Sequence, residues 1–358
     1  MTRSSVTIAS NMLARIRGTR YGKTLDYDSG ALTNSDVAIL RFLSALELIE
    51  SDVWQQYDEL GGVKQDPQDP YRLALQSLQS NLSHFITSCA LDEISHTTYL
   101  NLYLESEGVD PVDLDRYRTL RGSRAAGALN VGQLTNLQHL NLELGWTVSH
   151  SEEGWAKDSC WSSETACIID LQSIPSTDMD FEEPSEIRMI AKTALLHFGY
   201  LENLMWELYA GLSQRIRRAK ILAVTLGIGC SEIAHYHASL DLTRRFVLGA
   251  RFSIDDSVES TNNLGRLNPG LPVREKRLRS IRFPFSIERV SPNEPVARSS
   301  GSDCSMAARA IDRLAKSGLF IGHSPEFTRV LFQMAYEADK ASIETPRWPI
   351  PSAIPPSN

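Results

Sequence analysis

Two short stretches of this chain carry the same side chains at the same spacing. Residues 49–57 and 201–209 each contain a Glu, a Trp four residues later and a Tyr three residues after the Trp. The six residues are Glu50, Trp54, Tyr57, Glu202, Trp206 and Tyr209. This spacing places each set of three along one side of an α-helix. A carboxylate on a buried helix face is costly unless it is paired or bound to a metal.

A second motif, Glu-x-x-His, follows each of these stretches. Glu93 and His96 follow the first, and Glu232 and His235 follow the second. Residues three apart on a helix point in the same direction. One such motif is weak evidence, but two, each in a long helical pattern and each after a matching stretch, are much stronger. Four helices that point these groups inward would form a two-metal site of four carboxylates and two imidazoles.

The spacing of apolar residues predicts the helices that would carry these groups. We expect four long helices, and two shorter amphipathic helices close to the C-terminus. The four cover about 36–60, 71–107, 185–210 and 217–248, and the shorter two cover about 304–318 and 325–342. The inward face of the first contains Leu40, Leu43, Glu47, Glu50, Trp54 and Tyr57. Gly227 and Gly229 fit a close helix–helix approach or a bend in the fourth.

A long connection, 109–184, separates the second and third helices. It contains Gly, Asn, Ser and Asp clusters with only short apolar runs, so we expect little regular structure in it. A connection of this length inside a domain is typical of a functional lid or a crossover. If the second and third helices run parallel, the chain must travel the length of the bundle between them. The short break at 211–214 predicts that the third and fourth helices are antiparallel.

The sequence therefore divides into five parts. The helical bundle, 35–250, includes the connection 109–184 as a crossover or lid. The segment 251–303 is rich in Pro, Ser, Asn and Gly, and we interpret it as an irregular loop around the bundle. Its basic cluster, 274–282, is a solvated surface or a docking site for an acidic partner. The other parts are an N-terminal arm (1–34), the C-terminal helices (304–344) and a Pro-rich tail (345–358).

Composition narrows the function classes. The net charge of -8 argues against general affinity for nucleic acids. No run of eighteen apolar residues occurs, so we expect no membrane span. The five cysteines include no C-x-x-C pair, which excludes the usual zinc-ribbon and rubredoxin spacings and gives no disulfide framework. A reducing, cytoplasmic location is the simpler interpretation.

The order Glu, Glu-x-x-His, Glu, Glu-x-x-His resembles the ferritin-like di-iron carboxylate superfamily over about residues 36–245. It is most similar to stand-alone ferritin-like proteins, including those called desiccation-related. The resemblance implies an all-α fold, a ferritin-like antiparallel four-helix bundle with a long crossover between helices two and three and extra C-terminal helices. It also implies that Glu50 and Glu202 are single ligands, that Glu93 and Glu232 bridge the metals, and that the histidines are terminal ligands.

The resemblance leaves three functions open. The leading one is an oxidoreductase with two Fe ions that activates dioxygen on an organic substrate. An electron donor would supply the electrons. The second is disproportionation of peroxide at two Mn ions, and the third is non-catalytic metal binding or stress protection. The chain lacks the Cys-rich electron-transfer module of rubrerythrins and is much longer than a cage-forming ferritin subunit. We therefore expect a monomer or small homo-oligomer, not a ferritin cage.

Several residues admit two interpretations. Glu47 lies three residues before Glu50 on the same helix face, while its counterpart in the repeat is Gly199. We assign Glu50 as the ligand because Trp54 and Tyr57 fix the alignment, so Glu47→Ala should leave most metal binding intact. Tyr57 and Tyr209 are the candidate catalytic side chains, since a buried phenol beside a carboxylate needs a partner. Among the other candidates, Cys89 is expected to pack as a small apolar residue, Asp92 and Glu207 to face solvent, and His197 to pack or to hydrogen-bond near the site.

Overall fold

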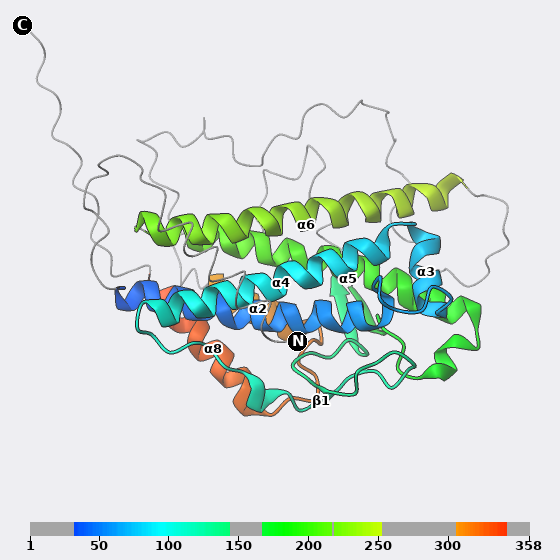
Figure 1. Ribbon diagram of the computed structural model, residues 1–358, viewed down its shortest axis with the longest axis horizontal. Coiled ribbons are helices and arrows are strands. Elements are labelled where there is room, and N and C mark those ends of the chain that lie inside the picture. The colour runs from blue at the N-terminus through cyan, green and yellow to red at the C-terminus, as the bar shows by residue number, and fades with distance from the viewer. Residues whose placement is uncertain (1–31, 144–166, 217, 253–305, 342–358) are drawn as a thin grey trace, which may run out of the picture. The chain divides into compact units, whose positions relative to one another are not determined.

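The structure of the protein is a computed structural model that describes residues 32–143, 167–216, 218–252 and 306–341 (Figure 1). These residues form seven α-helices and four strands of two to five residues, which confirms the all-α class. The chain divides into two compact units. One contains the residues up to Phe246 and from Ser305 onward, and the other contains Val247–Cys304. The first unit holds every feature described below.

Four long helices lie side by side in the first unit (Figure 1). They are α2 (Asn34–Gly61), α4 (Leu82–Ser106), α5 (Pro184–Ser213) and α6 (Ala219–Phe252), the last of which crosses the boundary between the units. Their bounds lie within a few residues of the four helices expected from the sequence, except that α4 begins later than the expected second helix. The inward face expected for the first helix is fully buried along α2.

Side-chain contacts give the directions of α2 and α4. Near the start of α2, the Ser44 hydroxyl donates to Asn101 Oδ1 at 2.7 Å, close to the end of α4. Near the end of α2, the Thr87 hydroxyl from the first half of α4 donates to Asp58 Oδ1. The residue numbers rise in one helix as they fall in the other. The two helices are therefore antiparallel.

Contacts between α2 and α5 give the direction of α5 in the same way. Trp54 Nε1 of α2 donates to Glu202 Oε1 of α5 at 3.0 Å, and Tyr209, later in α5, donates to Glu47, earlier in α2. The helix α5 is therefore antiparallel to α2 and parallel to α4. A crossover between α4 and α5 is required by this geometry, as the sequence predicted.

The helix α6 packs against α5 and is antiparallel to it. Ser213, the last residue of α5, donates to Thr225 near the start of α6 at 3.3 Å, whereas Glu202 lies opposite His235 further along α6. Gly229 explains how closely the two helices approach, because a Cβ atom there would lie 3.0 Å from Tyr209 Cβ. A Cβ atom at Gly227 would meet nothing within 4 Å. The close approach expected at the two glycines therefore occurs at Gly229 only.

The start and end of α2 follow from local chemistry. Thr33 and Asp36 form a capping box, in which each side chain accepts the backbone N–H of the other residue. These bonds satisfy N–H groups that have no partner within the helix. At the other end, a Cβ atom on Gly61 would lie 2.5 Å from Leu75 Cδ1. A larger residue at this position would therefore require the Leu75 side chain to shift, and glycine lets the next helix pack closely against the end of α2.

The expected single helix over 71–107 is wrong, because this segment forms two helices. A short helix, α3 (Pro70–Leu78), precedes α4, and the backbone at Gln79 is extended between them. The apolar face of α3 contacts α5, whereas α4 contacts α2. Tyr71 on α3 also donates to the backbone oxygen of Ser173 at 2.7 Å, near the end of the crossover. The break thus lets one segment contact two different neighbours.

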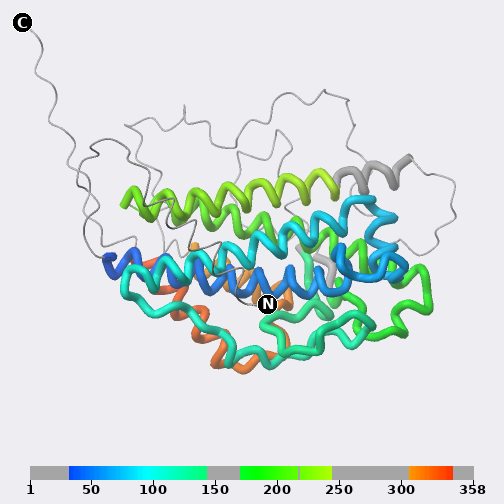
Figure 2. Tube along the Cα trace, in the orientation of Figure 1, coloured from blue at the N-terminus to red at the C-terminus, as the bar shows by residue number. Residues whose placement is uncertain are grey.

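The crossover contains more regular structure than the sequence indicated. Its strands form two antiparallel pairs, β1 (Leu120–Arg121) with β2 (Gly132–Gln133) and β3 (Leu140–Glu143) with β4 (Cys167–Leu171). Two 3₁₀ turns, η1 (Asp115–Tyr117) and η4 (Asp178–Phe181), flank the strands. The strands are too short to show a clear alternating pattern in the sequence. In the view of Figure 2 the crossover lies below α2, on the side away from α6.

A buried carboxylate attaches the crossover to α2. Asp52 accepts hydrogen bonds from the backbone N–H of Leu134 at 3.0 Å and from the Thr135 hydroxyl at 2.7 Å. Gln56, one turn later, donates to the same Asp52 oxygen at 3.1 Å and to Thr135 at 2.7 Å. Arg118, itself part of the crossover, forms an ion pair with Asp52. The crossover is thereby held by satisfied polar contacts rather than by apolar packing alone.

The two C-terminal helices complete the unit. They are α7 (Met306–Lys316), which contacts α5, and α8 (Pro325–Lys340), which contacts α2 and α7. Their positions agree with the helices expected at 304–318 and 325–342. Asp339 of α8 accepts the backbone N–H groups of Ala307 and Ala308 at 3.0 Å each, and so satisfies the first turn of α7.

Several expectations fall on residues that the structure does not describe. The arm 1–34 is described only at residues 32–34, the segment 251–303 only at 251 and 252, and the C-terminal helices only at 306–341. The basic cluster 274–282 and the tail 345–358 lie wholly outside the described residues. Within the described ranges, no helix combines the length and apolar character needed to cross a membrane.

Replacing Asp52 with Ala should destabilise this attachment of the crossover. The substitution removes the acceptor of four hydrogen bonds and leaves buried donors without a partner, so we expect the free energy of unfolding to fall by about 3 kcal/mol. Chemical denaturation followed by circular dichroism measures the change. Asp115→Ala is the matched control, because Asp115 forms an exposed ion pair with the same Arg118 and should change stability by less than about 1 kcal/mol. Equal effects of the two variants would contradict this role of Asp52.

Candidate metal centre

Five carboxylates and two imidazoles converge between the four long helices. The carboxylates are fully buried and come from all four helices, two from α2 and one each from α4, α5 and α6; they are Glu47, Glu50, Glu93, Glu202 and Glu232. The imidazoles of His96 and His235 are 12% and 9% exposed. The structure thus brings together all six ligands expected from the sequence and adds Glu47 to them.

One group of possible ligands surrounds His96. Its Nδ1 atom lies 3.0 Å from Glu93 Oε2, 3.1 Å from Glu232 Oε1 and 3.4 Å from Glu47 Oε2. One ligand atom from each of these four residues lies within 4.8 Å of every other. Three oxygens and one nitrogen at this spacing are able to surround one metal ion.

A second group lies on the side of Glu50 and Glu202. Ligand oxygens of Glu50, Glu202 and Glu232 lie within 4.8 Å of one another. His235 Nδ1 faces the same region, 3.6 Å from Glu202 Oε2 and 3.2 Å from Glu93 Oε1. Glu93 therefore presents one oxygen to each histidine, and Glu232 belongs to both groups. These positions suit the bridging role that the resemblance implies for both residues.

Several buried oxygens of this cluster have no partner among the described residues. Neither oxygen of Glu50 forms a hydrogen bond, and Glu232 Oε2 forms none. Buried polar groups are nearly always paired, and an unpaired buried charge is especially costly. Oxygens that converge without donors are the arrangement that a bound cation satisfies. The residues therefore fit a two-metal centre of carboxylate and imidazole ligands.

The pKa values of the glutamates also indicate that the cluster lacks compensating positive charge. Burial raises the pKa of Glu47 to about 7, and burial and neighbouring carboxylates hold the pKa values of Glu50 and Glu232 well above their usual range. Burial also raises the pKa of Glu93, but hydrogen bonds from the two histidines outweigh it and lower that pKa to about 2. Without cations, protons must neutralise much of the cluster.

Burial lowers the pKa values of the two histidines, but their carboxylate partners outweigh it and raise both. For His96 these partners are Glu232, Glu47 and Glu93. For His235 the largest is Asp92, whose Oδ2 atom lies 3.1 Å from Nε2. Asp92 was expected to be solvated, and it is 47% exposed. Its contact leaves Nδ1 of His235 facing the cluster, and a carboxylate of this kind fixes the orientation of a metal-binding imidazole.

Two aromatic side chains hold carboxylates in place across the helices. Trp54 donates its indole N–H to Glu202 Oε1, and Tyr209 donates its hydroxyl to Glu47. Trp54 also stacks on Phe198, with ring centroids 4.8 Å apart. Trp206, the repeat partner of Trp54, is only half-buried, and its Nε1 atom has no hydrogen-bond partner among the described residues. The two halves of the repeat therefore differ around the carboxylates.

The hydroxyls of Tyr57 and Tyr209 have different hydrogen-bond partners, although the two residues occupy equivalent places in the repeat. Tyr209 reaches Glu47, but the repeat counterpart of Glu47 is Gly199, which offers Tyr57 no side chain. Tyr57 instead donates to Ser173 Oγ at 2.8 Å and lies 2.7 Å from His197 Nδ1. The structure thus places Tyr209 on the cluster, whereas the hydrogen bonds of Tyr57 go to the crossover and to α5.

Glu47 and Glu50 both face the cluster, on different sides of Glu232. The sequence assigned one of them as the ligand of the first helix, whereas the geometry includes both as candidates. Their spacing of three residues was the available signal, since it puts both on one face. We therefore expect Glu47→Ala to weaken binding at the His96 position, instead of leaving most metal binding intact.

The comparisons with known proteins add nothing to this description. No family model, no curated protein and no solved structure matches the chain. The resemblance to ferritin-like proteins therefore rests on the residues and geometry described above.

The metal-free protein should lose stability as the pH rises from about 4.5 to 7. Glu47 has a higher pKa when folded than when unfolded, so the folded state binds more protons in this range. Its ionisation should lower the free energy of unfolding by up to roughly 3 kcal/mol. Denaturation at a series of pH values in the presence of a chelator measures the slope. Glu47→Gln should flatten it, and an unchanged slope in that variant would contradict the assignment.

Replacing Glu50 with Gln should stabilise the metal-free protein at pH 8. Gln keeps the volume of the side chain, but it needs neither a buried negative charge nor the uptake of a proton at pH 8, so the free energy of unfolding should rise by about 1–3 kcal/mol. The exposed Glu105→Gln on α4 is the control and should change stability by less than about 0.5 kcal/mol. A loss of stability in Glu50→Gln without metal would show that Glu50 has a structural partner.

Proposed function

We propose that this chain is a member of the ferritin-like di-iron carboxylate superfamily. The helices α2, α4, α5 and α6 then correspond to its four-helix bundle. The support is the direction of the helices, with α4 and α5 parallel and joined by a crossover, and the order of the two repeated motifs along them. Both features match the arrangement in which a Glu from each of two helices and Glu-x-x-His from each of the others point inward.

We propose further that the cluster binds two divalent metal ions, with iron as the leading choice. Carboxylate oxygens and imidazole nitrogens are ligands that suit both iron and manganese. Two divalent ions would carry four positive charges against five carboxylates, which nearly neutralises the cluster. The unpartnered oxygens of Glu50 and Glu232 are the observation on which this proposal rests most directly.

The proposed activity is that of an oxidoreductase which activates dioxygen on an organic substrate. Two iron ions, when bound, would supply electrons for the reduction of dioxygen. The protein's own contribution is to fix the ligands and to exclude water from them. Trp54 orients Glu202, Asp92 orients His235, and Tyr209 keeps a proton on a hydroxyl that contacts Glu47. Tyr209 is thus a positioning residue that donates a hydrogen bond to the carboxylate.

Metal loading tests the proposal. Metal-free protein titrated anaerobically with Fe(II), and separately with Mn(II), should bind two ions per chain by elemental analysis. Glu93→Ala should abolish binding of both ions, because Glu93 presents one oxygen to each histidine. The exposed Glu105→Ala is the matched control and should retain two ions. Full binding by Glu93→Ala, or none by the wild type, would contradict the proposal.

Addition of oxidant then distinguishes the activities. Dioxygen uptake by the Fe(II)-loaded protein, measured with an oxygen electrode, should exceed that of the Glu93→Ala variant at least tenfold. Oxygen release from peroxide by the Mn(II)-loaded protein, without turnover of an organic compound, would assign the manganese activity instead. Two bound ions with neither reaction would contradict the enzymatic proposal and favour a metal-binding role.

A further inference from the structure

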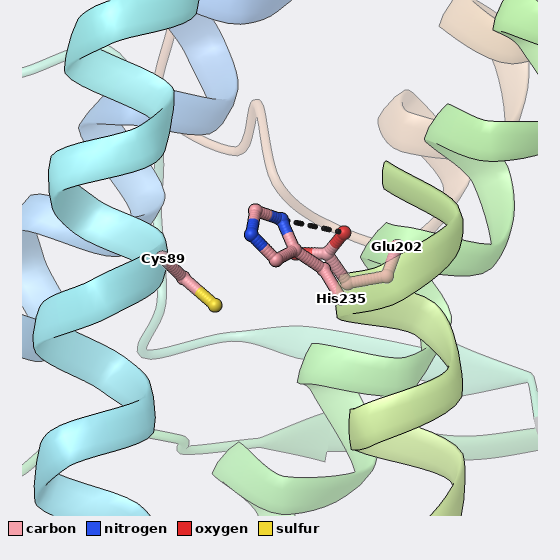
Figure 3. Close-up of side chains that lie close together, drawn as sticks. All are labelled: Cys89, Glu202 and His235. Atoms are coloured by element: carbon pink, nitrogen blue, oxygen red, sulfur yellow. Dashed lines mark ion pairs between the residues drawn. The ribbon is translucent and has the colours of Figure 1, made fainter. Parts of the chain in front are cut away.

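Cys89 lies beside the candidate metal centre. It projects from α4 toward His235 on α6, and Glu202 on α5 lies on the other side of the His235 ring in this view (Figure 3). Its sulfur, a ring nitrogen of His235 and a carboxylate oxygen of Glu202 lie within 4.8 Å of one another. Cys89 is fully buried, and it forms no disulfide. The sequence predicted a small buried residue at this position, and the burial agrees.

Each of the two neighbours of the thiol turns one ligand atom toward the cluster. Trp54 occupies Glu202 Oε1, but Oε2 has no hydrogen-bond partner among the described residues. Asp92 occupies Nε2 of His235, and Nδ1 faces the carboxylates, 3.2 Å from Glu93 Oε1. This Nδ1 atom and Glu202 Oε2 lie 3.6 Å apart. A fully buried carboxylate oxygen and an imidazole nitrogen are therefore oriented as ligands next to the thiol.

The spacing of these atoms is close to that around a single ion. Bond lengths of about 2.3 Å to sulfur and about 2.0–2.2 Å to nitrogen and oxygen place the ligands of a tetrahedral ion roughly 3.5 Å apart. The distance between His235 Nδ1 and Glu202 Oε2 already meets this value. The sulfur lies within 4.8 Å of both atoms, so it would need to approach them by at most about 1.3 Å.

We propose that Cys89, Glu202 and His235 form a binding position for a thiophilic divalent ion of the zinc or cobalt class. This inference rests on the proposed function, because it concerns the second ion of the same centre. Thiolate and imidazole ligands favour such ions, whereas the group around His96 offers three carboxylates and one imidazole and suits iron or manganese. The centre accepts two iron ions when iron alone is offered, and the Cys89 position would prefer the thiophilic ion when both kinds are present.

The repeat explains why only one position contains sulfur. Cys89 lies four residues before Glu93, and the residue four before Glu232 is Ile228. The aliphatic side chain of Ile228 provides no ligand atom on the side of His96. The two positions therefore differ by a thiol as well as by Glu47, and each difference acts on a different ion.

Cobalt(II) binding tests the inference, because a Co–thiolate bond gives an intense near-ultraviolet charge-transfer band that oxygen and nitrogen ligands do not. The wild-type metal-free protein should develop this band on titration with Co(II). Cys89→Ala should lose it and should bind the cobalt of this position at least roughly tenfold more weakly. The first equivalent of Mn(II), followed by electron paramagnetic resonance, should bind Cys89→Ala as tightly as the wild type, since the His96 position contains no sulfur.

The other four cysteines require a control. A variant that retains Cys89 and carries Ser at positions 160, 167, 230 and 304 should keep the full band, while Mn(II) binding by Cys89→Ala shows that this variant is folded. A band that survives in Cys89→Ala, or cobalt binding without any thiolate band, would overturn the inference and leave the proposed function in place. Failure of both Mn(II) and Co(II) to bind would instead overturn the proposed function.

Discussion

The burial of five carboxylates between four helices is the constraint on which the rest of the structure depends. Such a cluster is stable only if protons, donors or cations compensate for the lost solvation. The two histidines and the side chains of Trp54 and Tyr209 supply some of this compensation, but Glu50 receives no donor from the described residues. The helices must therefore hold these side chains together against their mutual repulsion, which explains why the cluster is surrounded by tightly packed apolar and aromatic residues.

The repeat shows how a nearly symmetric arrangement becomes two different sides. Glu47 has no counterpart because Gly199 occupies the equivalent place, and Cys89 has none because Ile228 does. As a result, Tyr209 contacts a carboxylate whereas Tyr57 contacts His197 and Ser173. The backbone keeps the repeat, while a few side chains give the two halves different ligands and different electrostatics.

The sequence predicted the long helices because they depend on spacing within single helices, and it predicted that the six candidate ligands would converge because the same motifs occur in each half of the chain. It did not predict the break before α4, since the apolar pattern continues through residues 71–107 while its direction in space changes. The short strands of the crossover gave no periodic signal. The role of Asp92 depends on a contact with His235, 143 residues away, which no local pattern records. Interactions between distant segments therefore account for most of what the sequence left open.

Many contacts of the remaining elements are with α2 and α5. The helix α8 contacts α2, α7 contacts α5, and Asp52 and Tyr57 of α2 attach to the crossover. These contacts fix α2 and α5, which contribute carboxylates and the aromatic residues that orient them. The helices α4 and α6 contribute both histidines, the only partly exposed members of the cluster. Among the described residues, α2 and α5 thus hold three of the five carboxylates of the cluster, and the two histidines on α4 and α6 are its members nearest to solvent.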